Sequence, residues 1–338
     1  MSKYRRGAQS FVLENMPTIT TWASIAGKKE SEGPLANYFD ITQKDNYFGQ
    51  KTWEQAEQKM QEIAIETLLK KANLMLSDIQ LVFSGDLLNQ CIGSSFSLRN
   101  KNLPHLGLYG ACSTMAESLL LSAMTVSSGF TDNAIAITSS HFASSERQYR
   151  FPLCYGGQRT PTAQWTVTGS GAALVSSSGH GPKIDACTIG TVTDLGITDA
   201  NNMGAAMAPA AFATIKAHLL DMNRSPEDFD LIVTGDLGQV GKELLIQLAR
   251  NEGISLAGRL EDCGCLIFDR DKQDVHAGGS GCGCSAVTLC SCLLEKIRTR
   301  KYNRILFCGT GALLSPTSVQ QGLPVSGVCH GVSIWGGN

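Results

Sequence analysis

The sequence contains no long apolar run and no concentration of basic charge. Its longest apolar stretches are broken by Ser, Gly or charged residues and are shorter than the ~20 residues that a membrane-spanning helix needs. Close to the start of the chain, Gln9, Ser10 and Glu14 interrupt any signal-peptide core. There are 28 basic and 30 acidic residues, without the clustered basic surplus of a nucleic-acid-binding protein. We therefore expect no transmembrane helix, no signal peptide and no nucleic-acid partner.

Cysteine, in contrast, is abundant, with 12 residues in a chain of 338. Because we expect no export signal, so many cysteines indicate a reducing compartment. Three C-x-C pairs depart from the usual spacing of zinc sites, so we interpret them as small core residues and keep metal binding as a minor alternative. We expect neither a metal nor a cofactor. The pairs are Cys263/Cys265, Cys282/Cys284 and Cys290/Cys292.

The two parts of the chain repeat one another. Seven residues between 69 and 87 recur with the same spacing between 219 and 237. Each copy predicts a helix, a turn and an apolar strand that ends in Gly-Asp-Leu. Such a repeat predicts that a gene duplication produced the fold.

A second pair of segments follows these two copies. Cys112 precedes a predicted helix over 117–126, and Cys282 precedes a predicted helix over 287–297; each helix leads into an apolar strand. The two copies of this second pair lie further apart in the sequence than the two copies of the Gly-Asp-Leu segment. The difference indicates an insertion in the second half, over 254–275.

Strands that alternate with helices predict an α/β fold with right-handed crossovers. The duplication predicts two halves, residues 1–178 and 183–338, with a linker at 176–182 and a pseudo-twofold axis between them. In this arrangement the helices that follow Cys112 and Cys282 point their N-termini at each other at the centre.

The turn at 108–114 joins a predicted strand to the helix that follows Cys112. A thiol at a helix N-terminus tends to have a lowered pKa, because unpaired N–H groups and the helix dipole stabilise negative charge. Cys112 is therefore a nucleophile, the floor of a pocket for anions, or a small buried core residue. The residues alone leave these alternatives open.

Four stretches resemble motifs of the thiolase superfamily, which includes the thiolases and the ketoacyl synthases. The resemblance spans nearly the whole chain and implies a layered αβαβα core built from the two halves. The sequence departs from the family pattern at Val275, where the family has a glycine before a histidine. The stretches are 110–113, the nucleophile turn; 167–173, a Gly-rich strand; 276–281, which begins with the histidine; and 307–311, a glycine turn.

The stretch 159–169, the turn around Cys112 and the Gly-Cys-Gly-Cys-Ser run at 281–285 are similar to the stage V sporulation protein AD family of spore-forming bacteria. This resemblance implies a protein that binds dipicolinic acid, alone or as its calcium chelate, and supports its uptake into the developing spore. It also implies a soluble or peripheral protein at the forespore or spore inner membrane, with other stage V sporulation A proteins as partners. Superfamily members pair along an edge strand, which implies a homodimer formed through 133–139.

The sequence matches only some of the catalytic residues of the superfamily. Cys112 matches the nucleophile and His276 matches one imidazole position. Asp236 stands where the family has His or Asn; loss of an oxyanion donor costs ~10²–10³ in rate, and a carboxylate also repels the oxyanion. We favour Asp236 as a residue that closes the turn after its strand, as Asp86 does in the first half. We therefore expect a protein that binds rather than an enzyme.

A site for dipicolinate needs room for an aromatic ring, and cations or N–H donors for two carboxylates. Arginine suits a carboxylate because its planar guanidinium binds both oxygens. For each single candidate, a solvated loop or a dimer contact explains the same residue type equally well. The candidates are Arg150 and Arg159 for the carboxylates, Tyr155 for the ring, and Cys112, His276 and Asp236 for the rest of the pocket.

We rank three hypotheses. The first is a non-catalytic protein that binds dipicolinate and passes it to membrane partners. The second is an acyl-transferring condensing enzyme, similar to a ketoacyl synthase, with Cys112 as nucleophile. The third is a structural subunit with an emptied active site that docks other proteins.

Overall fold

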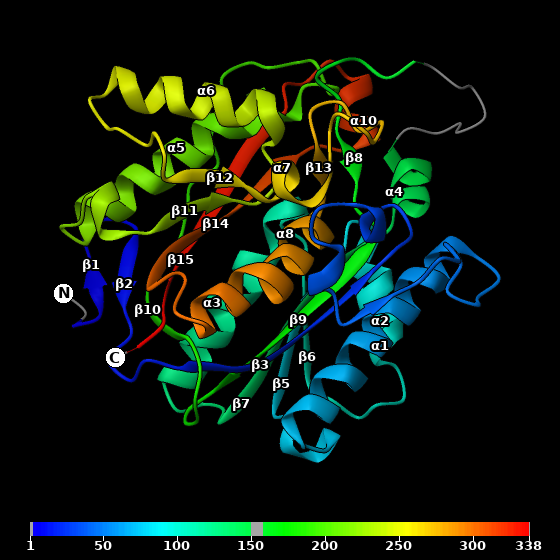
Figure 1. The fold of residues 1–338 in the computed structure, drawn as a ribbon. Helices are drawn as coiled ribbons and strands as arrows, with labels where there is room; N and C mark the ends of the chain where they lie inside the picture. Colours follow the sequence, from blue (N-terminus) through cyan, green and yellow to red (C-terminus); the bar gives the residue numbers. More distant parts are fainter. Residues whose placement is uncertain (1–2, 150–157, 338) are drawn as a thin grey trace.

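The computed structural model describes residues 3–149 and 158–337. A 13-stranded sheet divides into two mixed parts, called here the first and the second sheet, which enclose a pair of central helices (Figure 1). Further helices cover the outer faces. The strands of the first sheet are β3 (Thr18–Ala26), β5 (Leu81–Gly85), β6 (His105–Leu108), β7 (Asn133–Ser140) and β9 (Gly169–Ser176). Those of the second are β10 (Lys183–Thr188), β11 (Leu231–Thr234), β12 (Leu260–Asp262), β14 (Arg304–Leu313) and β15 (Ser326–Trp335).

Short strands and the helices complete the described fold. The short strands are β1 (Arg5–Arg6), β2 (Ser10–Val12), β4 (Ile41–Thr42), β8 (Trp165–Thr166) and β13 (Gly279–Ser280). The helices are α1 (Trp53–Ala72), α2 (Ile92–Leu98), α3 (Thr114–Ser127), α4 (Phe142–Tyr149), α5 (Met203–Asp221), α6 (Gly238–Asn251), α7 (Cys263–Ile267), α8 (Cys282–Thr288), α9 (Leu294–Arg298) and α10 (Pro316–Gln320). A π-helical stretch, Leu289–Leu293, joins α8 to α9.

The two sheets have the same topology. The strand order is β3-β9-β7-β5-β6 in the first and β10-β15-β14-β11-β12 in the second. In each sheet the first two pairings are antiparallel and the next two are parallel. The sheets meet where Lys183 of β10 pairs with Thr18 of β3. This topology confirms the predicted α/β fold class, and the matching order is what a duplication produces.

Helices α3 and α8 lie in the middle of the molecule, between the sheets (Figure 1). Helix α1 covers the outer face of the first sheet and α5 that of the second. The central layer forms one hydrophobic core, to which α3 contributes Met115 and Leu119 and the helix that begins at Cys282 contributes Val287. Burial of such side chains is the main favourable term in folding.

Local signals in the sequence place several element ends. Thr52 caps α1 by accepting a hydrogen bond from the backbone N–H of Gln55, and threonine is a favoured residue at this position. Asn73 ends the same helix in the left-handed conformation that asparagine tolerates. The interpretation of Cys290 and Cys292 as core residues is confirmed, because both are buried in the central layer.

The two halves touch through backbone at the centre. A Cβ atom added to Gly311 of β14 would lie 2.7 Å from the carbonyl oxygen of Gly110, and one added to Gly309 would lie 2.6 Å from the Cβ of Ala116. These distances are too short for any side chain. The expected glycine turn at 307–311 is a continuous part of β14, and its glycines are required for this close approach.

One prediction about these elements is wrong, and a second is correct only in part. The segment 133–139 lies in β7, which pairs with β9 on one side and β5 on the other, so it is an internal strand. The outer strand of the first sheet is β6. The additional residues of the second half fall mainly at 263–281, between β12 and α8, rather than over 254–275. The expected domain boundaries fall between β9 and β10 and stay a prediction.

Within the described residues, none of the helices combines the length and apolar character that a membrane span needs.

Candidate functional site

Cys112 lies in a single 3₁₀ turn, Ala111–Ser113, between β6 and α3. Ala111 has a φ of 52°, in the left-handed region that a residue with a Cβ atom rarely adopts. Side-chain hydrogen bonds hold this conformation: the Ser113 hydroxyl donates to the carbonyl of Gly110, and the Thr114 hydroxyl donates to the carbonyl of Ala111. The turn fixes the Cys112 side chain at the centre, where it is 6% exposed.

Asp236 reaches the same place from the end of β11. Its buried carboxylate accepts hydrogen bonds from the Gly281 N–H (2.8 Å), the Thr310 hydroxyl (2.9 Å) and the Ser280 hydroxyl (3.2 Å). The same carboxylate interacts electrostatically with the buried Cys112 thiol. Asp236 therefore links the end of β11 to β13, β14 and the turn of the first half.

The interpretation of Asp236 as the residue that closes its own turn is wrong. Asp262 has that role, because its carboxylate accepts from the backbone N–H groups of Leu237 (2.8 Å) and Gly238 (2.9 Å). Asp86 does close the corresponding turn of the first half, since it accepts from the Leu88 N–H at 2.9 Å. The repeated Gly-Asp-Leu sequence therefore supports two different hydrogen-bond networks.

The electrostatics of this pair oppose a nucleophile. Burial raises the pKa of Asp236 to about 6, so this carboxylate is ionised at neutral pH. Burial raises the pKa of the Cys112 thiol well above its usual value, and the nearby Asp236 charge raises it further. The expected lowering of the Cys112 pKa at a helix N-terminus is therefore wrong. Desolvation and a facing carboxylate outweigh the helix dipole.

A cavity of about 130 Å³ lies beside Cys112. An engineered cavity of about 150 Å³ in another protein holds a benzene ring, so this volume suits one aromatic ring. Helix α4, the loop before α5 and the segment around α10 form the walls. The lining residues are Leu87, Ala111, Cys112, Ser145, Glu146, Tyr149, Thr166, Ala200, Asn201, Met203, Ser280, Ala312, Leu314 and Val319.

Tyr149 is the aromatic wall of this cavity. Its hydroxyl donates a 2.7 Å hydrogen bond to the carbonyl of Leu87, and its ring packs against Leu87, Cys112 and Cys282. The sequence showed Tyr149 among other aromatic residues of the same region but gave no signal that singled it out. Its role depends on the orientation of α4, which the sequence does not specify.

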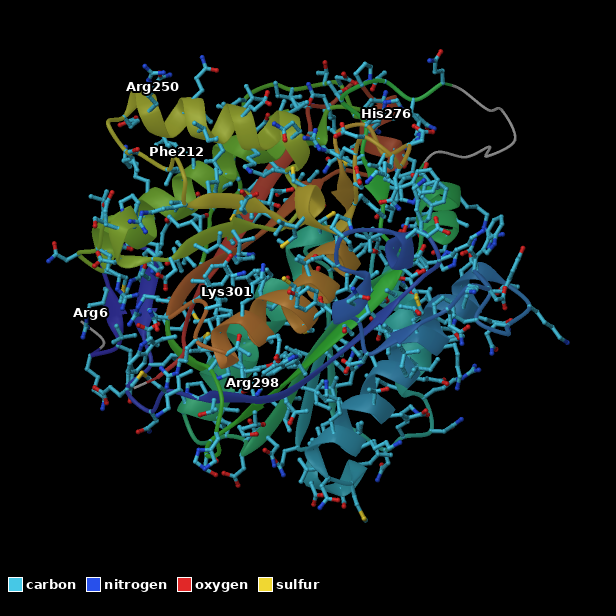
Figure 2. The ribbon with its side chains drawn as sticks, in the orientation of Figure 1. Arg6, Phe212, Arg250, His276, Arg298 and Lys301 are labelled. Carbon is cyan, nitrogen blue, oxygen red and sulfur yellow. The ribbon has the colours of Figure 1, made fainter. Side chains whose placement is uncertain are left out.

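His276 and Arg159 are not among the residues that line this cavity. His276 lies on the loop before β13, at the end of the molecule that carries α10 (Figure 2), and its Nε2 is 3.3 Å from Asp274. Arg159 pairs with the same carboxylate at 2.9 Å and lies over the ring of Trp165. Arg150 and Tyr155 lie outside the described residues. Of the four predicted site residues that the structure describes, it brings together Cys112 and Asp236.

No group of three or more His, Cys, Asp or Glu side chains in the described part of the chain is arranged to hold a metal ion.

The comparisons with known proteins agree with one another. A family model described as stage V sporulation protein AD matches residues 7–335. Stage V sporulation protein AD of Bacillus subtilis (strain 168) is 44% identical over 326 residues, which are 96% of each chain. The chain belongs to the stage V sporulation protein AD family. The recognition made from the Arg-Thr-Pro-Thr stretch and the turn around Cys112 is confirmed.

Solved structures place this sporulation family member in the thiolase-like fold. A 3-oxoacyl-[acyl-carrier-protein] synthase III from Aquifex aeolicus VF5 superposes with a TM-score of 0.58 at 14% identity, over 94% of this chain and 99% of that one. OleA from Xanthomonas campestris gives a TM-score of 0.60 at 14% identity, over 96% and 99%. At such identity these structures establish the fold alone.

Proposed function

We propose that this sporulation protein binds dipicolinic acid in the cavity beside Cys112 and supports its uptake into the developing spore without catalysis. The observation that carries the proposal is the buried Asp236 carboxylate, held by Gly281 and Thr310, whose charge raises the pKa of the Cys112 thiol. A condensing enzyme needs a thiolate and a donor for an oxyanion. Here a carboxylate stands where the donor belongs and keeps the thiol protonated.

The walls of the cavity suit a small aromatic ligand with polar edges. Tyr149 offers a ring for stacking, while Thr166, Asn201 and Ser280 offer polar groups at several positions. Asp236, directly behind Cys112, repels a free dianion. The calcium chelate of dipicolinate carries no net charge, so this acidic group favours the chelate over the free acid.

Isothermal titration calorimetry tests this function. We expect saturable binding of dipicolinate, strengthened by calcium, and much weaker binding of pyridine-2-carboxylate, which lacks one carboxylate. Tyr149→Ala should weaken binding at least tenfold, whereas Tyr38→Ala, at a half-exposed tyrosine outside the cavity, should leave it unchanged. Absence of binding by the folded wild-type protein with and without calcium would contradict the proposal.

The second candidate function is acyl transfer by a condensing enzyme, which the position of Cys112 in the turn before α3 favours. Incubation with acyl thioesters of several chain lengths, followed by intact-mass measurement, separates the two candidates. A mass increase that is lost in Cys112→Ala would support the enzyme. We expect no adduct, because the thiolate fraction is very small.

We further propose that the protein forms a homodimer and acts at the forespore or spore inner membrane with other stage V sporulation A proteins. Strand β6 replaces 133–139 as the dimer edge, because among the described strands it has a pairing partner on one side only. Its Leu106 is 53% exposed, and Tyr109, just beyond the strand, is 50% exposed. An unpaired edge with exposed apolar side chains is a common site of association.

A further inference from the structure

Several basic side chains meet one carboxylate on the side of β8 that faces away from the cavity. Thr166 of β8 lines the cavity, whereas Trp165, its neighbour in the strand, does not. Successive side chains of a strand point to opposite faces, so the Trp165 ring lies on the other side. The basic residues are Lys29, Arg159 and His276, and the carboxylate is that of Asp274.

The Trp165 indole has an aromatic ring on one face and two cations on the other. The Phe142 ring, at the start of α4, stacks on it with the ring centroids 3.8 Å apart and the planes 10° from parallel. Because Phe142 fills that face, the cations occupy the opposite one. The Lys29 ammonium lies 4.0 Å and the guanidinium carbon of Arg159 lies 4.7 Å from the indole centroid. Two like charges therefore share one face of the ring.

The ring by itself does not account for two cations at this place. The negative face of an indole attracts a cation, yet two cations over one face repel each other. Burial lowers the pKa of the Lys29 ammonium, and the charge of Arg159 lowers it further, by more than Asp274 alone raises it. The two side chains therefore meet in a region of positive potential.

Two donors of this cluster have no acceptor within the part of the chain that the structure describes. Arg159 contacts Asp274 through Nη2 alone, which lies 2.9 Å from a carboxylate oxygen and 2.9 Å from the backbone carbonyl. Its Nη1 is buried without a hydrogen-bond partner, and the Lys29 ammonium contacts the ring but forms no hydrogen bond or ion pair. Donors left unpaired in this way cost free energy, which an incoming acceptor recovers.

The neighbouring carboxylates leave these two donors open. The Asp274 side chain is 77% exposed, and its carboxylate is shared between Arg159 and His276, whose Nε2 is 3.3 Å away. An ion pair with one partner in water contributes little and is readily exchanged. Glu30, next to Lys29 in the chain, is buried and accepts from the Thr168 N–H instead.

We propose that Lys29 and Arg159 form a binding site for an oxyanion, the carboxylate or phosphate group of a small molecule, outside the cavity beside Cys112. An oxyanion that bridges the ammonium and the guanidinium accepts hydrogen bonds from both and offsets the repulsion between them. Trp165 supports the two side chains, and Phe142 holds the ring in place. The site is independent of the proposed function, because none of these four residues lines the cavity.

Titration with inorganic phosphate and with acetate, at constant ionic strength, tests the site and separates the two classes of anion. The fluorescence of Trp165 reports binding, and loss of the signal in Trp165→Phe assigns it among the four tryptophans. We expect a saturable change with at least one of the two anions. Lys29→Gln should bind about tenfold more weakly, as loss of a charged donor predicts. Lys28→Gln, the same change at the exposed neighbour, should bind like the wild type.

A second variant and a second measurement support this test. Arg159→Lys keeps the positive charge but lacks the Nη1 donor, so it should also bind more weakly. In thermal unfolding, the anion that binds should raise the Tm of the wild type and of Lys28→Gln by more than that of Lys29→Gln. Absence of both the fluorescence change and the Tm shift with either anion, or equal affinities of Lys29→Gln and the wild type, would overturn the inference.

Discussion

The thiol of Cys112 lies in the electrostatic field of the Asp236 carboxylate, which belongs to the other half of the chain. Both groups are buried, and each belongs to a strand end that the fold brings to the centre. In this position a negative charge opposes formation of a thiolate. The arrangement therefore opposes ionisation of Cys112 within a thiolase-like fold.

Replacement of Asp236 should make Cys112 more reactive. In Asp236→Asn the facing charge is absent, so the pKa of Cys112 falls and its thiolate fraction rises. We expect alkylation by iodoacetamide at pH 8, followed by intact mass, to be severalfold faster than in the wild type. The double variant with Cys112→Ala identifies the labelled thiol. An unchanged rate would mean that burial alone suppresses the thiolate.

Glu30→Gln should change how stability depends on pH. Glu30 is fully buried, and its carboxylate accepts from the Thr168 N–H at 2.9 Å. Burial raises its pKa to about 7, from 4.5 in an exposed carboxyl. The pKa of Glu30 is higher in the folded than in the unfolded protein, so protonation of Glu30 stabilises the fold. This contribution to the free energy of unfolding is fully present below pH 4.5 and is lost as the pH rises through 7.

This loss amounts to about 3 kcal/mol, from the difference between the two pKa values. Urea denaturation gives the free energy of unfolding of both proteins at pH 4.5 and at pH 8. The difference between Glu30→Gln and the wild type should shift in favour of the variant by about that amount from the lower to the higher pH. Glu32→Gln, at an exposed residue of the same turn, is the control and should show no such gain. Parallel pH profiles for Glu30→Gln and the wild type would contradict the prediction.

Much of the fold could be predicted from the sequence, because helix and strand patterns are local and the repeat compares one half with the other. The helix before the first Gly-Asp-Leu followed from the repeat, and the turn at Cys112 followed from its position between a strand and a helix. The order of strands in the sheet is not local. For this reason 133–139 was predicted as an edge, although β7 lies between two neighbours.

The site was less predictable for the same physical reason. Asp86 and Asp236 have the same local sequence, yet one closes its turn and the other reaches Gly281 and Thr310. Lys29 carries no sequence signal either, since a lysine in a loop is usually solvated. Only the packing of its loop against β8 places it over Trp165.

Leu106→Lys should disrupt the proposed homodimer. The exposed leucine lies on the outer strand β6, and a lysine there places a charge on each of two strands that would pair. Analytical ultracentrifugation should show the wild type as a dimer and the variant as a monomer. Leu220→Lys, at a leucine on α5 that is 70% exposed, should remain dimeric. A monomeric wild type would refute the dimer itself.

Gly171→Ala should destabilise the protein by about 2 kcal/mol or more, as overpacked cores do. A Cβ atom at Gly171 in β9 would lie 2.3 Å from the carbonyl oxygen of Ala286 in α8, and neither backbone can move freely. Thermal and urea unfolding measure the change. Gly331→Ala is the matched control in β15, because its Cβ would lie no closer than 3.6 Å to any neighbour. Equal stabilities would mean that α8 can shift away from β9.

At Gly309 and Gly311 the second half of the chain packs directly against the first, with no side chain of these two residues in between. Opening the two halves like a clamp around a ligand would break this close-packed contact at the centre. Entry and exit of a ligand therefore depend on small displacements of α4 and of the segment around α10, which border the cavity. The rate of exchange would then be set by these short segments, while the duplicated core stays rigid.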